Sequence, residues 1–195
     1  MRLKNLVVFA IATAFVSTSM ASASADAAKP GQSMTHMKTG AGLSAALEAA
    51  GVVLYVQGGA TASVIGDSIS AAGGQYVFHI PITANKAGVQ HVGSNIVFFN
   101  TANNVQLQLR NPVIDLAKGV VTATVPQAGN QTLDVLTITN ASTLKAKITN
   151  DRKAKLRTTA FAGATLSLAP GIAAAISTIL VLPANSLPEA ARSEE

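Results

Sequence analysis

Basic residues are concentrated in one short segment, residues 145–157, which contains a single acid, Asp151. Apolar and basic residues alternate along this segment, and the alternation predicts a β-hairpin that turns at Asn150–Asp151. The hairpin should present its cations on one outer face, whose expected members are Lys145, Lys147, Lys153, Lys155 and Arg157. Like charges that face each other across two strands cost stability, and an anionic partner would relieve that cost. We therefore expect either a binding site for an anionic cell-wall polymer or a sheet edge that lysines protect against aggregation.

Tyr55, Tyr76 and His79 are the candidate ligands for a small molecule, a metal or haem. A phenolate can serve as the axial ligand of haem iron, but it needs a partner that keeps it ionised, and the sequence shows none beside either tyrosine. His79 lies in the apolar segment Tyr76–Ile80, where alternation places it on the polar face of a strand. The sequence thus predicts no resident cofactor and no metal, with haem as the alternative.

Residues that could perform catalysis do not form a recognisable set. His91 and Ser94 could pair as base and nucleophile, yet no G-x-S-x-G turn surrounds Ser94 and no nearby acid would orient the histidine. Asp115 has no second carboxylate close in the sequence, and the chain contains no cysteine. The lack of cysteine excludes disulfides, thiolate zinc sites and a cysteine nucleophile. We expect a protein that is not an enzyme.

The composition indicates one ordered domain with an aliphatic core. Of 195 residues, 49% are hydrophobic, 12% are charged and 4% are aromatic, with no Trp. Such a chain is too apolar to be disordered, and its core must be built mainly from Val, Leu, Ile and Ala. The mildly basic balance of 14 Lys and Arg against 9 Asp and Glu does not indicate a nucleic-acid partner.

The N-terminus has the three parts of a secretory signal peptide. Arg2 and Lys4 precede an apolar run, Leu6–Val16, and the small residues Ala23–Ala25 provide a cleavage site. This run is too short to cross roughly 30 Å of hydrocarbon. We therefore expect residues 1–25 to be removed and the mature chain, without a transmembrane segment, to be secreted into the extracellular or periplasmic space. Another surface protein is an alternative partner there.

The periodicity of apolar residues predicts two short helices among many short strands. The helices are expected at Leu43–Ala50 and Ile172–Leu180, next to Gly51 and Pro170–Gly171. Strands are expected at Val52–Val56, Tyr76–Thr83, Asn95–Asn100, Val105–Arg110, Val113–Leu116, Val120–Val125, Leu133–Thr139, Leu144–Ile148, Ala154–Phe161 and Ala164–Leu168. This spacing favours an all-β fold, an antiparallel sandwich or barrel, and we expect an antiparallel two-sheet β-sandwich of immunoglobulin-like type. We expect one domain over residues 41–183, with flexible segments at 26–40 and 184–195.

The segment from Gly88 to Val125 resembles the core of the HtaA domain family. The shared order is a glycine, an apolar strand, a polar turn, an alternating strand that ends in Asn-Pro, an apolar-Ile-Asp triplet and a glycine-led strand. In this chain these parts are Gly93, Ile96–Phe99, Ala102–Asn104, Val105–Leu109, Asn111–Pro112, Val113–Asp115 and Gly119–Val125. The closing Leu166–Pro170 and the Ala-rich helix after it are also similar to the end of that family.

The resemblance implies an exported two-sheet β-sandwich with small helices, in a family whose best-known members bind haem through a tyrosinate. The haem-pocket residues differ here. Thr101 stands where the family has a histidine, and Gly51 and Ala72, four residues before the two tyrosines, replace the serine of the family's Ser-x-x-x-Tyr motif. We therefore expect a structural or interaction module at the cell surface or outside the cell, with haem-type ligand binding as the alternative.

Overall fold

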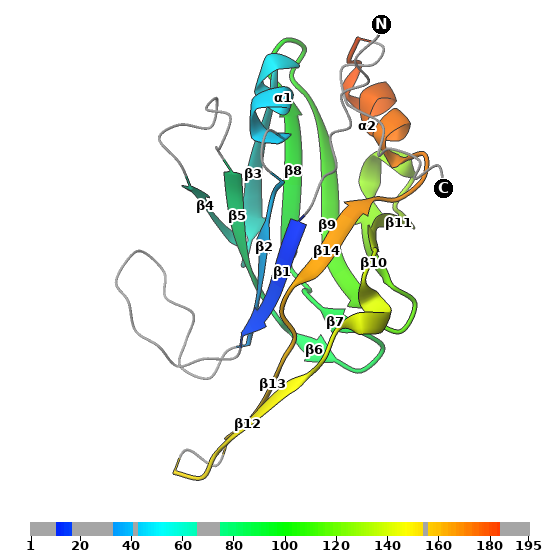
Figure 1. Cartoon of the computed structure of the whole chain (residues 1–195). Coiled ribbons are helices and arrows are strands. Elements are labelled where there is room, and N and C mark those ends of the chain that lie inside the picture. The colour runs from blue at the N-terminus through cyan, green and yellow to red at the C-terminus, as the bar shows by residue number, and fades with distance from the viewer. Residues whose placement is uncertain (1–10, 17–32, 41–42, 66–74, 154–155, 184–195) are drawn as a thin grey trace, which may run out of the picture.

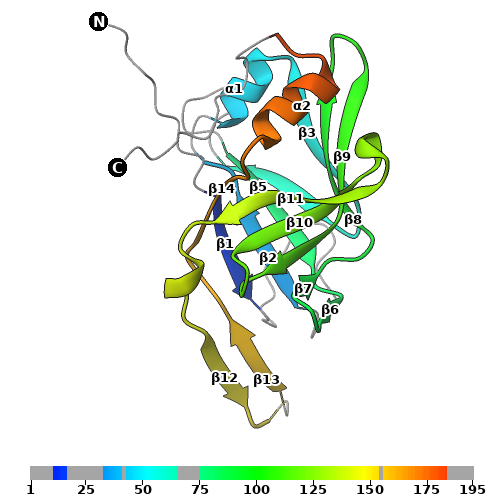
Figure 2. The same cartoon turned by 90° about the vertical axis from the view of Figure 1, so that its right-hand side faces the viewer.

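A computed structural model describes residues 11–16, 33–40, 43–65, 75–153 and 156–183 (Figures 1 and 2). The strands are β1 (Ile11–Val16), β2 (Met34–Lys38), β3 (Val52–Gly58), β4 (Thr61–Ile65), β5 (Gln75–Pro81), β6 (Ala84–Asn85), β7 (Val89–Gln90), β8 (Ser94–Asn100), β9 (Val105–Asp115), β10 (Val120–Val125), β11 (Gln131–Ile138), β12 (Lys147–Asp151), β13 (Leu156–Ala160) and β14 (Ala164–Leu168). The α-helices are α1 (Leu43–Ala49) and α2 (Ile172–Leu180), and two single 3₁₀ turns are η1 (Pro126–Ala128) and η2 (Ala141–Thr143). The prediction of a mostly β protein with two short helices is confirmed.

The main sheet has 12 strands and curls into a half-barrel (Figure 1). The strand order along this sheet is β3-β8-β9-β10-β11-β14-β1-β2-β5-β4. The short strand β7 pairs with both β6 and β9 and lies outside this order. The strand pairs of the described residues are all antiparallel, as predicted. In this order, β1 is the strand that connects the group from β3 to β14 with the group β2-β5-β4. The two groups therefore form one curled sheet, whereas the sequence predicted two separate sheets.

Apolar side chains, most of them aliphatic as the composition predicts, fill the interior of the half-barrel. Leu54, Phe78 and Ile96 are buried on the inner face of their strands, and the helices add Leu47 and Ile176 to the same core. Figures 1 and 2 show α1 and α2 at the same end of the sheet. The helices thus close this end of the core and shield it from water.

Two asparagines fix the C-terminal end of α2 to the sheet. The side-chain amides of Asn100 and Asn103 donate to the carbonyl oxygen of Leu180 at 2.8 and 3.1 Å. This oxygen belongs to the last turn of the helix, where carbonyl groups lack a partner within the helix. The bonds therefore tie α2 to the turn between β8 and β9.

Several predicted boundaries agree with the observed elements, whereas the strand expected at Leu144–Ile148 is β12 at Lys147–Asp151, and one pair of predicted strands is not a pair. β10, β14 and α2 have the predicted bounds. The two strands expected at Val105–Arg110 and Val113–Leu116 are one strand, β9, because Asn111 adopts a positive φ of 50° and the register against β10 shifts between Thr122 and Thr124. A β-bulge therefore accommodates the Asn-Pro sequence, and the strand continues through it.

Part of the segment that we expected to be flexible, 26–40, forms β2. This strand pairs with β1 on one side and β5 on the other, and Thr35 and Met37 are buried. β4 and the short pair of β6 and β7 were not predicted either. β1 lies within the predicted leader, whose other residues lie outside the described part of the chain. The expected C-terminal tail, 184–195, lies outside it as well.

Candidate functional site

The basic segment forms a separate two-stranded ribbon, β12 and β13, which projects from the main sheet away from the helices (Figures 1 and 2). Every residue of β12 is exposed, including Ile148, which keeps 50% of its surface accessible. The predicted hairpin is therefore present, but the inward apolar face expected for its first strand is not. A two-stranded ribbon of this kind is only marginally stable by itself in water.

The cations occupy both faces and the tip of the ribbon, so the prediction of one shared cationic face is wrong. Lys147 pairs with Ala160, and Arg157 pairs with Asn150, which places Lys147 and Arg157 on opposite faces. The expected repulsion across the strands is therefore absent for these two residues. The physical reason is the position of the turn. It follows Asp151, whereas we expected it at Asn150–Asp151, so different residues of the two strands are paired and share a face.

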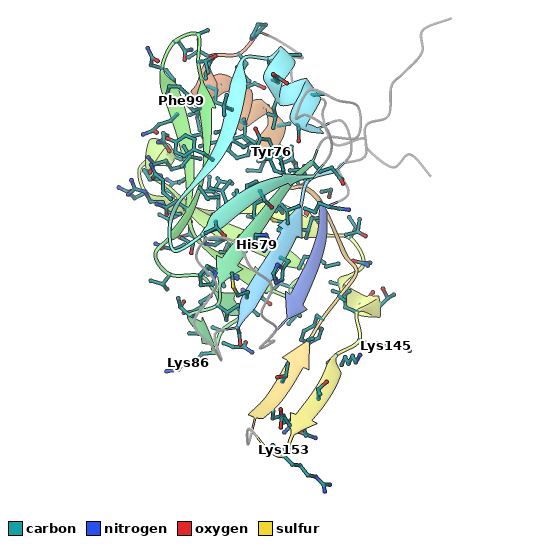
Figure 3. The ribbon with its side chains drawn as sticks, turned by 90° about the vertical axis from the view of Figure 1, so that its left-hand side faces the viewer. Tyr76, His79, Lys86, Phe99, Lys145 and Lys153 are labelled. Atoms are coloured by element: carbon teal, nitrogen blue, oxygen red, sulfur yellow. The ribbon has the colours of Figure 1, made fainter. Side chains whose placement is uncertain are left out.

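The remaining cations extend the charge from the base of the ribbon to its end (Figure 3). Lys145 is exposed in the connection before β12, and Lys153 is exposed in the turn beside Arg152. The backbone amide of Lys153 donates to Oδ1 of Asp151 at 2.9 Å, which shapes the turn. Lys155 lies outside the described residues. The ribbon is thus a cationic projection that a partner can approach from either face.

Tyr55, Tyr76 and His79 do not form a common site. Tyr76 and His79 are three positions apart on β5, so Tyr76 is buried in the core while His79 lies on the outer face (Figure 3). Burial raises the pKa of Tyr76 above its usual 10.0, which disfavours the phenolate. The hydroxyl of Tyr55, on β3, donates to Oε1 of Gln106 at 3.1 Å. The three candidate ligands are thus held apart, each with contacts of its own.

An apolar cavity of about 80 Å³ lies inside the half-barrel, between the sheet and the helices. Leu54, Phe78, Ile96 and Ile176 are among its walls, and Thr39 is the only residue of the lining with a polar side chain. Pockets that hold a drug-sized ligand have volumes of roughly 300–1,000 Å³. Haem is at least as large as a drug-sized ligand, and its iron needs an axial ligand from the protein. A cavity of this volume, with this apolar lining, therefore does not fit haem.

His79 has a partner that the sequence analysis missed, His36 on β2. The two residues are opposite each other in the register, and their Nδ1 atoms are 2.7 Å apart. Burial, together with the charge of His79, lowers the pKa of His36 below its usual 6.5. The sequence carries no local signal for β2, because the strand contains no Val or Ile; only in the structure do buried Thr35 and Met37 alternate with less buried neighbours.

His91 and Ser94 do not pair as base and nucleophile. The imidazole of His91 is 1% exposed; its Nδ1–H donates to the carbonyl oxygen of Pro112 at 2.9 Å, and its Nε2 accepts from the hydroxyl of Thr35 at 2.7 Å. The hydroxyl oxygen of Ser94 is buried without a hydrogen-bond partner. Asp115 accepts a bond from the backbone amide of Lys118 at 3.0 Å, which is a turn-forming role. The side chains of His91 and Asp115 thus have partners other than Ser94, and neither is arranged as a catalytic base.

Comparison with protein-family models, curated proteins and solved structures finds no match to this chain. Across the described ranges, no group of three or more His, Asp or Glu residues could hold a metal ion. Neither α1 nor α2 is long and apolar enough to cross a membrane. The resemblance to the HtaA family stays a prediction.

Proposed function

We propose that this chain is an exported, non-enzymatic interaction module whose β12–β13 ribbon binds an anionic polymer at the cell surface, such as a teichoic acid or another anionic cell-wall polymer. The single observation that carries this proposal is the ribbon itself: a projecting, fully exposed β12 strand within a segment that has one acid among its cations. Clustered charge of one sign attracts an oppositely charged partner and accelerates its binding. The shape and the charge thus favour the same type of partner.

The position of the cations favours binding over protection of a sheet edge. Protective lysines lie on the strands whose free edges would otherwise pair with another chain. Lys145 precedes β12, and Arg152 and Lys153 are in the turn, so these three cations are not on a strand. Cations around a finger-shaped projection suit a flexible polymer that can wrap it.

The decisive experiment compares two double variants with the same change in net charge. K147Q/K153Q removes two cations from the ribbon, and K86Q/K118Q removes two exposed lysines from the main body, where the Lys118–Asp115 ion pair is exposed on the lysine side. We expect K147Q/K153Q to weaken binding to purified teichoic acid by roughly ten- to thirtyfold at low salt, as for two basic residues at an anionic surface. K86Q/K118Q should bind like the unmodified chain. Equal binding by both variants, or equal weakening, would refute a site at the ribbon.

The ionic strength provides an independent readout of the same contact. Exposed charges are screened over about 10 Å at 0.1 M salt, so the affinity should fall steeply as salt is added. K147Q/K153Q should show a shallower dependence on salt, because fewer charge contacts are lost. A salt dependence identical to that of the unmodified chain would place the contact elsewhere.

We also propose that the exported chain is an HtaA-like sandwich of two sheets. The support is the position of β1, which lies within the predicted leader and connects the two strand groups. Without residues 1–25, one sheet would have the order β3-β8-β9-β10-β11-β14 and the other would have the order β2-β5-β4. Hydrogen exchange tests this proposal: without the leader, the amides of β2 and β14 that faced β1 should exchange faster. Unchanged protection of these amides would contradict it.

A further inference from the structure

Two imidazoles face each other on the outer surface of the main sheet. His36 on β2 and His79 on β5 are direct partners in the register, so the paired backbones hold them in place. Their Nδ1 atoms are 2.7 Å apart, and the ring planes cross at 83°. A neutral imidazole carries one N–H, so in this contact one Nδ1 donates and the other accepts. The hydrogen of this bond lies between the two nitrogens, so a metal ion that binds both must displace it, with the N–H of the donating ring moving to Nε2.

The separation of these nitrogens selects among metal ions by coordination angle. Two ligands about 2.0 Å from a metal and 90° apart, as in square-planar or tetragonal coordination, lie about 2.8 Å from each other. Two ligands at the tetrahedral angle, which zinc prefers, lie about 3.3 Å apart. The observed 2.7 Å is close to the first value. Replacing the hydrogen by a metal ion thus requires less movement of the two nitrogens at a 90° angle, as with copper(II) or nickel(II), than at the tetrahedral angle of zinc.

The residues around His36 and His79 decide what fills the other coordination positions of a bound metal ion. The register places Thr61 of β4 opposite His79 on the side away from His36, and Thr61 is exposed. No third His, Asp or Glu joins the pair in the described part of the chain, so water must complete the coordination. Lys38, two positions along β2 on the same face, repels a metal ion and limits the affinity.

We propose that His36 and His79 form a binding site for a divalent copper or nickel ion, with the two Nδ1 atoms as adjacent ligands and water in the other positions. Imidazole is a suitable ligand for both ions, and copper(II) binds most tightly among the divalent first-row metals. The site lies on β2 and β5, whereas the anionic polymer is assigned to the ribbon. The outcome of either test therefore leaves the other proposal unaffected.

The test is a titration of the full chain with copper(II), nickel(II) and zinc(II) by calorimetry, with electron paramagnetic resonance for copper. We expect one copper ion per chain, nitrogen coordination in the resonance spectrum, and tighter binding of nickel than of zinc. His36→Gln and His79→Gln should each weaken copper binding by at least about tenfold, since each removes one of the two protein ligands. Tighter binding of zinc than of nickel would overturn the assignment of the metal.

Matched variants separate this site from other places where copper could bind. Lys38→Gln leaves both ligands in place and removes the neighbouring cation, so it should bind copper more tightly than the unmodified chain. The H36Q/H79Q double variant retains only the buried His91 as a histidine. Circular dichroism on each variant checks that the sheet is intact. Copper binding that persists unchanged in a folded H36Q/H79Q chain would overturn the proposal.

Discussion

Replacing Gly58 with alanine should destabilise the protein far more than the same replacement at another glycine of similar backbone conformation. Gly58 ends β3 with a positive φ of 74°, and a Cβ atom there would overlap the carbonyl oxygen of Gly93. That oxygen accepts a hydrogen bond from the amide of Gly59 at 3.2 Å. The turn between β3 and β4 therefore lies directly against the loop that leads into β8, and it has no room for a side chain.

The expected magnitude has two parts, and Gly129 isolates the first of them. Gly129 has a φ of 71° with no atom within 4 Å of a Cβ built there, so Gly129→Ala tests the left-handed conformation alone, which costs about 1 kcal/mol. Gly58→Ala has the same conformational cost and must also displace the Gly93 carbonyl and its bond to Gly59, which adds about 1–2 kcal/mol. We expect a total of about 2–3 kcal/mol for Gly58→Ala.

Urea unfolding followed by circular dichroism measures both variants on one scale. The difference between their free energies of unfolding gives the cost of the overlap, because the conformational cost is common to both. A difference below about 0.5 kcal/mol would refute the argument that backbone contact, in addition to φ, requires glycine at this position.

Three further predictions concern the buried polar residues of the core. Burial lowers the pKa of His91 below 6.5, so as the pH falls below 6.5 the unfolded chain binds a proton on this residue before the folded chain does. The free energy of unfolding should then decrease by at most about 1.4 kcal/mol per pH unit. His91→Gln should flatten this pH dependence in urea titrations. Ser94→Ala should leave the melting temperature unchanged or raise it, since the serine hydroxyl is buried without a hydrogen-bond partner. A decrease in the free energy of unfolding above about 1 kcal/mol would show that this hydroxyl does have such a partner. Asn100→Ala should lower the free energy of unfolding by about 1–3 kcal/mol, because it removes a buried bond to the end of α2, whereas the exposed Asn130→Gly should change it little in the same thermal scans.

Local sequence signals predict the elements whose boundaries depend on local chemistry. β10 begins after Lys118–Gly119, where Gly119 has a positive φ, and α2 begins after Pro170–Gly171. Both boundaries follow from conformations that glycine or proline prefers. The bounds of these elements could therefore be predicted without knowledge of the strands that pair with them.

β2 could not be predicted in the same way, because its evidence is spread over distant parts of the chain. The strand contains no Val or Ile, and the partner that places His36 opposite His79 follows more than thirty residues later. The candidate metal site depends on this pairing, so its second ligand could not be found from the residues around His79. The ribbon shows a related limit: alternation predicted a hairpin, but the turn position that decides which cations share a face is not fixed by alternation.

The apolar cavity under the helices should make the protein sensitive to hydrostatic pressure. Pressure favours the unfolded chain because unfolding eliminates internal void volume. A void of about 80 Å³ corresponds to at most about 50 mL/mol, so each 100 MPa should lower the free energy of unfolding by roughly 1 kcal/mol. Compression would thus loosen the packing between α2 and the sheet before it affects the densely paired strands β8 to β10, and an inert gas atom such as xenon, held in the void, would oppose that loosening.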